Sequence, residues 1–333
     1  MKLGTLHLDN NLLLAPMQAV TTAPYRRFCR MFQKIGLVSV PMIYTKRVIK
    51  NPKTIIPDLY RIEEEIPISI QLIGSDLKAL KETILFLESY KFNIIDLNVG
   101  CPSKRANNSQ EGAYLLQDLD LLKKLVNIAS KFSSRPISLK MRTGISDKIN
   151  ITEFSALINN SNIEFLTIHG RTANDRYDDS KLDIETIKQI KARVNIPVVG
   201  NGNIDNPLIA KSFLDYTNVD AIMIGRGSIG NPEIFNQINV FLKYGKIYPF
   251  QNDKERMRRL IEIYEKCLDE FIDESYLIPD SREKYKFKEL KRNAIWLTKN
   301  IRDSNIIRQR LSKTKDLTNL KHALQLYFEN SMN

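Results

Sequence analysis

The sequence is poor in cysteine, and its apolar residues never gather into a long unbroken run. Three of its 333 residues are cysteines, Cys29, Cys101 and Cys267, which excludes a disulfide framework and a zinc site built from four cysteines. No stretch reaches the roughly 20 apolar residues that cross a bilayer, and the opening residues MKLGTLHLDN lack the apolar core of a signal peptide. We therefore expect a cytoplasmic protein without a membrane segment or a metal site.

Glycine and proline are scarce as well, with 13 residues of each, while 43% of the chain is hydrophobic. This composition excludes a low-complexity chain and is typical of a folded globular protein. The length exceeds that of one ordinary domain, but a (β/α)8 barrel occupies about 250 residues as a single unit. A barrel followed by a smaller domain is therefore a natural interpretation.

Acidic residues are outnumbered, since 50 lysines and arginines stand against 38 aspartates and glutamates, a net charge of +12. Between Arg282 and Lys321 the chain holds 13 basic residues and four acidic ones. A solvated basic surface would explain the overall excess, but it would not explain this concentration near the end of the chain. The uneven distribution favours a polyanionic partner such as a nucleic acid.

Short apolar runs rich in β-branched residues recur along the first two thirds of the chain. Most are apolar throughout, as expected for parallel strands that are buried on both faces. Helical periodicity fills connecting segments such as 76–90, 118–132 and 205–216, and each of these opens with an aspartate that could cap the helix. Eight such units within about 230 residues favour a closed (β/α)8 barrel over a doubly wound sheet. The predicted strands are residues 12–16, 37–40, 67–72, 94–99, 136–141, 164–169, 196–200 and 220–225.

The strand pattern stops after residue 245. Helical spacing continues over residues 254–271, 284–300 and 316–328. We therefore predict a barrel domain over residues 1–245 and a basic, all-helical domain over residues 246–333. Three aromatic residues lie within the basic region, and we expect them to pack in the core of the helices rather than to stack on bases. They are Tyr285, Phe287 and Trp296.

Polar and glycine residues cluster just past the carboxyl ends of the predicted strands. Any strand end needs turn residues, so one such residue alone indicates nothing. In a (β/α)8 barrel, however, these positions converge on the rim that carries active sites. They comprise Pro16, Met17, Gln18, Gln71, Asn98, Cys101, Lys140, Arg142, His169, Arg171, Asn201, Gly202, Asn203, Gly225 and Arg226.

Gly225 opens the motif GRGSIG, which formally matches the glycine pattern of dinucleotide-binding folds. Such a motif belongs near the start of a βαβ unit, whereas here it follows the last predicted strand. We therefore interpret it as a phosphate-binding loop of the kind that follows strands 7 and 8 of barrels. Asn201, Gly202 and Asn203 would form the other half of that loop site.

Lys140 ends an apolar strand, which leaves three interpretations of its ammonium group: a Schiff-base lysine, a cation beside an anionic cofactor, or a surface lysine. A surface lysine fits such a strand least, because a buried ammonium needs an anionic or polar partner. Arg142 and Arg171 make the same rim more cationic. They favour an anionic or phosphate-bearing partner over an aldol substrate.

Cys101 also allows two interpretations. A lone cysteine is usually a small buried hydrophobe, but this one follows a strand at the rim and precedes a polar loop. No histidine is near it in the sequence, so a protease-like nucleophile has little support. An unperturbed thiol is mostly protonated at neutral pH, which suits a proton donor.

Seven motifs together resemble those of the tRNA-dihydrouridine synthases in order and spacing. They are LAPMQAVTTAPYRRF, QLIG, DLNVGCPSK, LKMRTG, TIHGRT, VVGNGNI and AIMIGRG, within residues 1–235, with a looser match in RQRLSKTKDLTNL. The combination of DLNVGCP and HGRT is quite specific. The resemblance implies an FMN-binding (β/α)8 barrel, a helical domain that grips tRNA, and NADPH (or NADH) as the reductant.

The same resemblance implies roles for individual residues. Cys101 would donate a proton, Asn98 would face the substrate base, and Lys140 would stabilise negative charge on reduced FMN. Hydride transfer to carbon 6 of uracil creates an enolate that takes the proton at carbon 5, after the base has left its stack. The residues expected to hold FMN are Pro16, Met17, Gln18, Gln71, Lys140, His169, Asn201, Gly202, Asn203, Gly225 and Arg226.

Two groups of residues are expected to contact RNA. The resemblance places Arg171, Arg176 and Tyr177 against the RNA or its base. Phosphate contacts from the basic region should make binding dependent on salt. The residues expected to make them are Lys288, Lys291, Arg292, Arg302, Arg308 and Arg310. We expect the protein to be a monomer.

The chain departs from the family pattern at a few positions. Ala19 stands where glycine is common, and Thr22 and Asn203 stand where aspartate is common. Asp179 and Ile184 stand in a segment that often has glycine and tryptophan. These changes concern the RNA contacts and the choice of uridine rather than the type of reaction.

Two other functions compete with this interpretation. A dihydroorotate-dehydrogenase-like flavin enzyme would share the barrel, the FMN and a cysteine on the rim, but it does not explain the basic tail. An RNA-binding protein or chaperone that keeps an inactive barrel would have no reason to keep Cys101, Lys140, Asn98 and His169 together.

Overall fold

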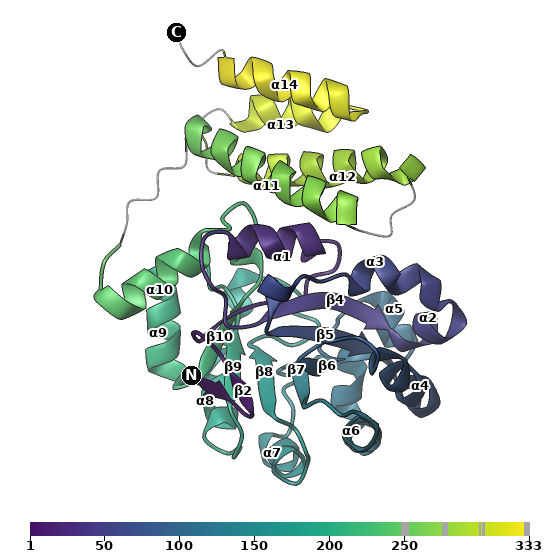
Figure 1. Cartoon of the computed structure of the whole chain (residues 1–333). Coiled ribbons are helices and arrows are strands. Elements are labelled where there is room, and N and C mark those ends of the chain that lie inside the picture. The colour runs from purple at the N-terminus through teal and green to yellow at the C-terminus, as the bar shows by residue number, and fades with distance from the viewer. Residues whose placement is uncertain (248–252, 275–278, 300, 302–303, 330–333) are drawn as a thin grey trace.

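Eight parallel strands form a barrel in the computed structural model, which describes residues 1–247, 253–274, 279–299, 301 and 304–329 (Figure 1). The hydrogen-bonded order is β3-β10-β9-β8-β7-β6-β5-β4, and a bridge between Leu13 and Leu37 joins the two ends of the sheet. The predicted (β/α)8 fold and its eight strands are confirmed. The strands are β3 (Leu12–Leu14), β4 (Val38–Tyr44), β5 (Ile68–Ile73), β6 (Ile94–Val99), β7 (Ile137–Arg142), β8 (Phe165–His169), β9 (Val198–Asn201) and β10 (Ala221–Ile224).

Helices follow the strands and cover the outside of the barrel (Figure 1). Asp76 and Asp118 cap their helices as predicted, since each carboxylate accepts a hydrogen bond of 2.9 Å from an amide of the first turn. The cap predicted at residue 205 is wrong. Asn206 caps α9, because Pro207 fixes the first helical position one residue later. The helices are α1 (Ala23–Arg30), α2 (Thr45–Lys50), α3 (Ile56–Leu59), α4 (Leu77–Leu87), α5 (Lys104–Asn108), α6 (Leu119–Phe132), α7 (Ile151–Asn159), α8 (Ile184–Lys191), α9 (Pro207–Thr217) and α10 (Ile234–Tyr244).

The interior of the barrel is apolar at the end where the strands begin. Leu13 and Phe165 pack there with Leu3, which comes from a short hairpin made of β1 (Lys2–Leu3) and β2 (Leu6–His7). The sequence does not predict this hairpin, because a two-residue strand carries no periodicity. The apolar end forms a floor, and the polar side chains of the interior lie above it, toward the carboxyl ends of the strands.

Four further helices stack over α1 beyond the barrel (Figure 1). Three of them are predicted by the sequence. The other, α13, is not, because it buries two residues, Ile307 and Leu311, among polar neighbours. Within the described ranges, no helix combines the length and apolar character that span a bilayer, and no group of three histidine, cysteine or acidic side chains is placed to hold a metal ion. The helices are α11 (Lys254–Glu274), α12 (Pro279–Leu297), α13 (Ser304–Lys313) and α14 (Leu317–Glu329).

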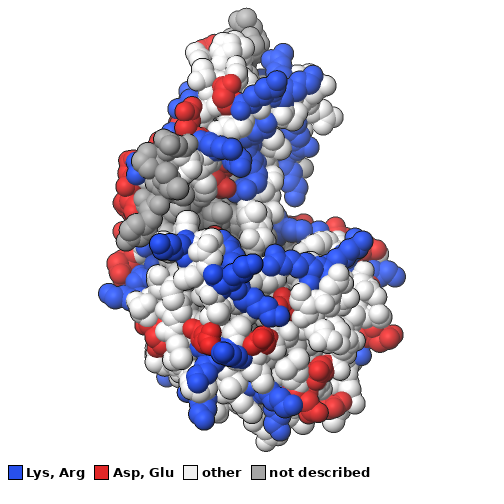
Figure 2. Space-filling view, turned by 90° about the vertical axis from the view of Figure 1, so that its right-hand side faces the viewer, with Lys and Arg blue, Asp and Glu red and all other residues white. Residues whose placement is uncertain are grey.

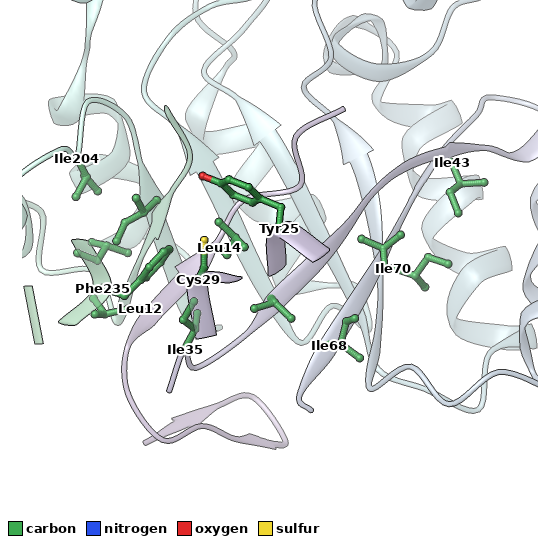
Figure 3. Packing of buried hydrophobic residues seen from close by; sticks show 14 of the residues in the cluster. Leu12, Leu14, Tyr25, Cys29, Ile35, Ile43, Ile68, Ile70, Ile204 and Phe235 are labelled. Atoms are coloured by element: carbon green, nitrogen blue, oxygen red, sulfur yellow. The ribbon is translucent and has the colours of Figure 1, made fainter. Parts of the chain in front are cut away.

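Helix α1 is buried between the barrel and α11. Tyr25, Phe28 and Cys29 are at most 1% exposed, and the ring of Phe28 meets that of Tyr264 edge-on, with 5.1 Å between centroids. Figure 3 shows Tyr25 and Cys29 beside Leu14 of the barrel wall. The apolar packing of the barrel wall therefore continues through α1 into α11.

The aromatic residues of the basic region pack inward, as predicted. Trp296 meets Tyr25 edge-on at 6.1 Å between ring centroids, and Tyr285 and Phe287 pack against the same hydrophobic cluster. Gly230, after the last strand, lies so close to α12 that an added Cβ atom would be 2.4 Å from the carbonyl oxygen of Trp296. The barrel and the helices thus share one hydrophobic core.

A buried ion pair ties α1 to the loop before β5. The guanidinium of Arg26 donates to Glu65 at 2.6 Å, and both side chains are 1% exposed. Arg26→Met should lower the free energy of unfolding by about 3–5 kcal/mol, because it leaves a buried carboxylate without its partner. Urea unfolding measures this loss. Arg47→Met is the matched control, because the Arg47–Asp58 pair is about 40% exposed. Its loss should lower the free energy of unfolding by less than about 1 kcal/mol. Equal losses in the two variants would contradict the prediction.

Candidate active site

A cavity of about 640 Å³ opens at the carboxyl ends of the strands. Loops and strand ends from around the whole barrel line it, as the convergence of strand ends predicts. All of the residues predicted as catalytic or cofactor-binding reach its wall, although their roles stay predictions. They are Pro16, Met17, Gln18, Gln71, Asn98, Cys101, Lys140, His169, Asn201, Gly202, Asn203, Gly225 and Arg226.

Below the cavity lies a buried acidic residue that the sequence analysis missed. Asp96 is 5% exposed and accepts hydrogen bonds from Ser138 at 2.6 Å and from Gln71 at 2.7 Å. Burial raises the pKa of Asp96 to about 6, although these hydrogen bonds and Lys140 oppose the shift. A single charged residue within the apolar run IIDLNV was the signal that could have found it.

Lys140 lies in the barrel mouth and not on the outer surface, so the surface interpretation is wrong. Its ammonium is 3.4 Å from the side-chain oxygen of Asn201. Burial lowers the pKa of Lys140 to about 8, while Asp96 acts to raise it and Arg142 to lower it. The lysine is therefore mostly a cation at neutral pH, as the interpretation beside an anionic cofactor requires.

Cys101 is the cysteine that reaches the cavity. Its backbone amide donates to the side-chain oxygen of Asn98 at 2.8 Å, and its sulfur lies 3.4 Å from the hydroxyl of Ser103. Gly112, at φ +64°, packs so closely that an added Cβ atom would lie 2.8 Å from the carbonyl of Cys101. Cys29 and Cys267, in contrast, are buried in the core. The thiol is thus held by its backbone, with its sulfur at the cavity wall.

Arg171 was predicted to contact RNA, and the structure places it elsewhere. It has no exposed surface, and its guanidinium lies 3.1 Å from the ring of His169 and donates to Asn203 at 2.8 Å. Burial, reinforced by the surrounding cations, lowers the pKa of His169 to about 2, so this imidazole is neutral. Because a buried guanidinium has no surface for RNA, we assign Arg171 to supporting the wall of the cavity.

Asp179 is a second residue that the sequence analysis did not place in the site. Its carboxylate lies 3.3 Å from Arg171 and 3.0 Å from Arg226. The family commonly has aspartate at position 203, where this chain has Asn203, which also accepts from Arg226 at 3.1 Å. The negative charge opposite the two guanidiniums is therefore present, but it comes from a neighbouring loop.

The glycine motif after β10 runs along the cavity wall. An added Cβ atom at Gly227 would lie 2.2 Å from the carbonyl oxygen of Ile204, so the close approach of the two loops requires glycine there. Tyr25 of α1 supports the motif from behind, because its hydroxyl donates to the carbonyl of Ser228 at 2.8 Å. The motif follows the last strand of the barrel, which agrees with rejecting a dinucleotide-binding fold.

Tyr177 and Arg176 lie at the entrance of the cavity. Tyr177 is 57% exposed, and the centroid of its ring is 5.4 Å from the guanidinium of Arg142 and 5.2 Å from that of Arg226. Arg176 is exposed, and its carbonyl accepts from Arg142 at 2.8 Å. Both predicted RNA residues are thus accessible from outside.

The basic residues predicted in the helices fall into two groups. Lys288 and Arg310 are exposed. Three others have partners within this domain. Lys291 donates to the carbonyls of Ser312 and Thr314, and Arg308 donates to Thr298. Arg292 pairs with Glu289 of its own helix. Residue Arg302 lies outside the described residues. Lys288 and Arg310 are therefore the stronger candidates for RNA contact.

Ala19 adopts a backbone conformation that suits glycine, the residue common in the family. Its φ is 58°, where a side chain costs about 1–2 kcal/mol. Ala19→Gly should therefore raise the free energy of unfolding by about 0.5–1 kcal/mol, since the freedom of glycine in the unfolded chain offsets part of the relief. Urea unfolding tests this, with Ala323→Gly in α14 as the control that should lose about 1 kcal/mol. A loss at position 19 would show that the turn is not strained.

Comparison with known proteins agrees with the motifs. A family model described as dihydrouridine synthase matches residues 13–333. The tRNA-dihydrouridine synthase B of Pasteurella multocida is 35% identical over 257 residues, which cover 76% of this chain and 77% of that protein. The protein of the same name from Escherichia coli K12 is 30% identical over 331 residues, 99% of each chain.

Among solved structures, a morphinone reductase mutant in complex with tetrahydroNAD matches with a TM-score of 0.53 at 11% identity. The match covers 72% of this chain and 89% of that one. At this identity the likeness concerns the fold alone, and it agrees with the barrel. The family model and the two relatives go further, and on their evidence the chain belongs to the dihydrouridine synthase family.

Proposed function

We propose that this chain is a tRNA-dihydrouridine synthase, which uses FMN and NADPH to reduce the bond between carbons 5 and 6 of a uracil base in tRNA. The position of Cys101 carries the proposal, because a thiol at the mouth of the cavity can protonate a base that enters it. Lys140, on the neighbouring strand β7, supplies a cation to the same cavity. Family membership supports the reaction.

The residues of the cavity fit FMN. The volume of about 640 Å³ lies within the range of cofactor pockets, about 300–1,000 Å³. Gly225 and Arg226 would hold the phosphate through backbone amides and a guanidinium. Lys140 and the neutral His169 would contact the ring system, which supplies the hydride when bound. The remaining contacts would come from Pro16, Met17, Gln18, Gln71, Asn201, Gly202 and Asn203.

Cys101 would complete the reduction of the base. Hydride addition at carbon 6 leaves an enolate, and the S–H bond of Cys101 breaks as a C–H bond forms at carbon 5. The thiolate then regains a proton from solvent. Asn98 would face the base while its side-chain oxygen holds the Cys101 amide. Each turnover therefore consumes one hydride and one proton and leaves the protein unchanged.

We propose that tRNA binds in the hollow between the helices and the barrel. Figure 2 shows lysine and arginine side chains gathered along both sides of this hollow. Tyr177 and Arg176 lie at the cavity entrance, where they would meet the base and its backbone. A polyanion with one base turned outward fits such a surface.

The exposed basic residues of the helices give a direct test of this surface. Lys288→Glu combined with Arg310→Glu should weaken tRNA binding at least about tenfold and make the dependence of affinity on salt less steep, since two phosphate contacts are lost. Filter binding at several KCl concentrations measures both effects. Lys34→Glu is the control, because Lys34 is exposed before β4, at the opposite end of the barrel. The same loss in this control would show that net charge alone governs binding.

The organisation of the chain follows from this proposal. Residues 1–245 would form the catalytic domain and residues 246–333 the RNA-binding domain of a cytoplasmic monomer. NADPH and tRNA would use one cavity mouth in turn. The nicotinamide nucleotide would therefore leave before the base enters.

Anaerobic stopped-flow absorbance of the purified protein tests the proposed function. The flavin is reduced with NADPH and then mixed with tRNA that lacks dihydrouridine. Re-oxidation by tRNA, but not by uracil or orotate, supports the synthase. Re-oxidation by orotate alone would instead indicate a dihydroorotate-dehydrogenase-like enzyme. A protein that binds tRNA but takes up no FMN would indicate an RNA-binding barrel without activity.

A further inference from the structure

Asp96 is a buried carboxylate for which the proposed reaction has no direct use. It lies in β6 beneath the cavity and is 5% exposed, and it is absent from the cavity lining. Its two oxygens accept hydrogen bonds from Ser138 and Gln71. Burying a charged carboxylate costs free energy unless the group is paired or hydrogen-bonded. The partners of Asp96 therefore indicate its role.

A chain of hydrogen bonds runs from Asp96 to the Cys101 loop. An ionised carboxylate can only accept, so the amide of Gln71 must turn its NH2 group toward Asp96. The oxygen of Gln71 then accepts from the NH2 group of Asn98 at 2.8 Å. This leaves the oxygen of Asn98 to accept from the backbone amides of Gly100 at 3.1 Å and of Cys101 at 2.8 Å. The carboxylate at one end, which can only accept, and the backbone amides at the other, which can only donate, thus fix the same direction for every bond in the chain.

The carboxylate of Asp96 also acts electrostatically on Lys140, which lies on the neighbouring strand β7. In the sheet Asp96 is paired with Ser138 and Asn98 with Lys140, and residues two apart on a strand share a face. Asp96 raises the pKa of Lys140, whereas burial and Arg142 lower it. Asn201 offers an oxygen to the ammonium from β9. Near neutral pH each member of the Asp96–Lys140 pair therefore stabilises the charge of the other.

We propose that Asp96 is a positioning residue that serves both sides of the active site: it keeps Lys140 a cation beside the flavin, and it orients the amides that present Cys101. The inference rests on the proposed function and deepens it. It links the cofactor side of the cavity to the proton-donor side through one buried charge. Asp96 itself touches neither substrate nor cofactor.

Asp96→Asn removes the negative charge of residue 96 but keeps the shape of its side chain. The new side chain has the same size, its oxygen can still accept from Gln71, and its NH2 group can donate to the hydroxyl of Ser138. The amide chain is kept, but Lys140 loses its anionic neighbour. Without that neighbour the ammonium gives up its proton at a lower pH, so the cation beside the flavin is lost near pH 8. At that pH and a fixed solution potential the ratio of reduced to oxidised flavin should fall about tenfold, which is a potential about 30 mV more negative. In a Lys140→Met background Asp96→Asn should cause no further change.

Spectroelectrochemical titration of the flavin-bound protein measures this ratio without tRNA. Ser69→Ala is the matched control, because Ser69 is buried in the same interior and bonds to Ser39 at 2.8 Å; its potential should equal that of the wild type. An unchanged potential in Asp96→Asn, or an equal shift in Ser69→Ala, overturns the inference. If Asp96→Asn does not fold, Ser138→Ala provides the test. Loss of the hydrogen bond from Ser138 to Asp96 should shift the flavin potential in the same direction by a smaller amount. An unchanged potential in Ser138→Ala would then overturn the inference.

The two proposals fail in different ways. A wild-type protein whose reduced flavin is not re-oxidised by tRNA defeats the proposed function, whatever the potential of Asp96→Asn. A wild-type protein that reduces tRNA, together with an unshifted potential in Asp96→Asn, defeats only the role of Asp96.

Discussion

Cys101→Ala should leave FMN bound and reducible by NADPH while slowing re-oxidation by tRNA about 10²–10⁴-fold, the usual contribution of a general acid. The half-reaction with NADPH needs no proton from the thiol, because the hydride passes to the flavin alone. The half-reaction with tRNA needs one at carbon 5 of uracil. Alanine also fits the site, since the backbone of residue 101, and not its sulfur, makes the contacts with Asn98 and with Ala113.

Separate stopped-flow measurements of the two half-reactions check this expectation. Cys267→Ala provides the control, because Cys267 is 2% exposed in α11 and should leave both rates near those of the wild type. A Cys101→Ala protein that is re-oxidised by tRNA at the wild-type rate would remove Cys101 from the mechanism. Slowing of the NADPH step to the same extent would show that the substitution disturbs the flavin site instead.

Lys140→Met should slow the reduction of FMN by NADPH about 10²–10³-fold, the effect of removing one preorganised charge from a developing anion. It should also weaken the binding of FMN. Negative charge develops on the flavin only in this half-reaction, so loss of the cation should not slow re-oxidation by tRNA, in contrast to Cys101→Ala. Lys148→Met is the control, because Lys148 follows the same strand but is 58% exposed and pairs with Asp183.

The pKa of Lys140 gives the same prediction a dependence on pH. Because burial lowers that pKa to about 8, the side chain is a cation below pH 8 and becomes neutral as the pH rises through it. Asp96 and Arg142 are the charged neighbours that act on it. The rate of flavin reduction in the wild type should therefore fall between about pH 7 and pH 9, and Lys140→Met should lack this transition. Identical profiles in the two proteins would assign the titration to another group.

The sequence predicted what depends on local pattern. Buried parallel strands are apolar along their whole length, so all eight were found, and strand ends in a barrel must converge, so the predicted cofactor and catalytic residues share one cavity. The hairpin at the start was missed because a two-residue strand has no period, and α13 was missed because it buries only Ile307 and Leu311 among polar neighbours. In each case, too few apolar positions stand out from their neighbours.

Features that depend on partners distant in sequence could not be predicted. Arg171 was expected to contact RNA because the resemblance to the tRNA-dihydrouridine synthases implied it, but Asp179 and Asn203 of two other loops enclose it. Asp96 was overlooked within an apolar strand because its partners lie on β5 and β7. Burial of a charge is decided by what surrounds it in three dimensions, and one sequence does not reveal that.

The position of α1 limits how this architecture can be recombined. The helix packs on the barrel on one side and on α11 on the other, and the hydroxyl of Tyr25 holds the loop at Ser228 while its ring touches Trp296. Grafting the C-terminal helices of a relative onto this barrel would strip α1 of its cover and loosen the glycine motif that lines the cavity. A working chimera must therefore exchange α1 together with the helices, although more than 200 residues separate Tyr25 from Trp296 along the chain.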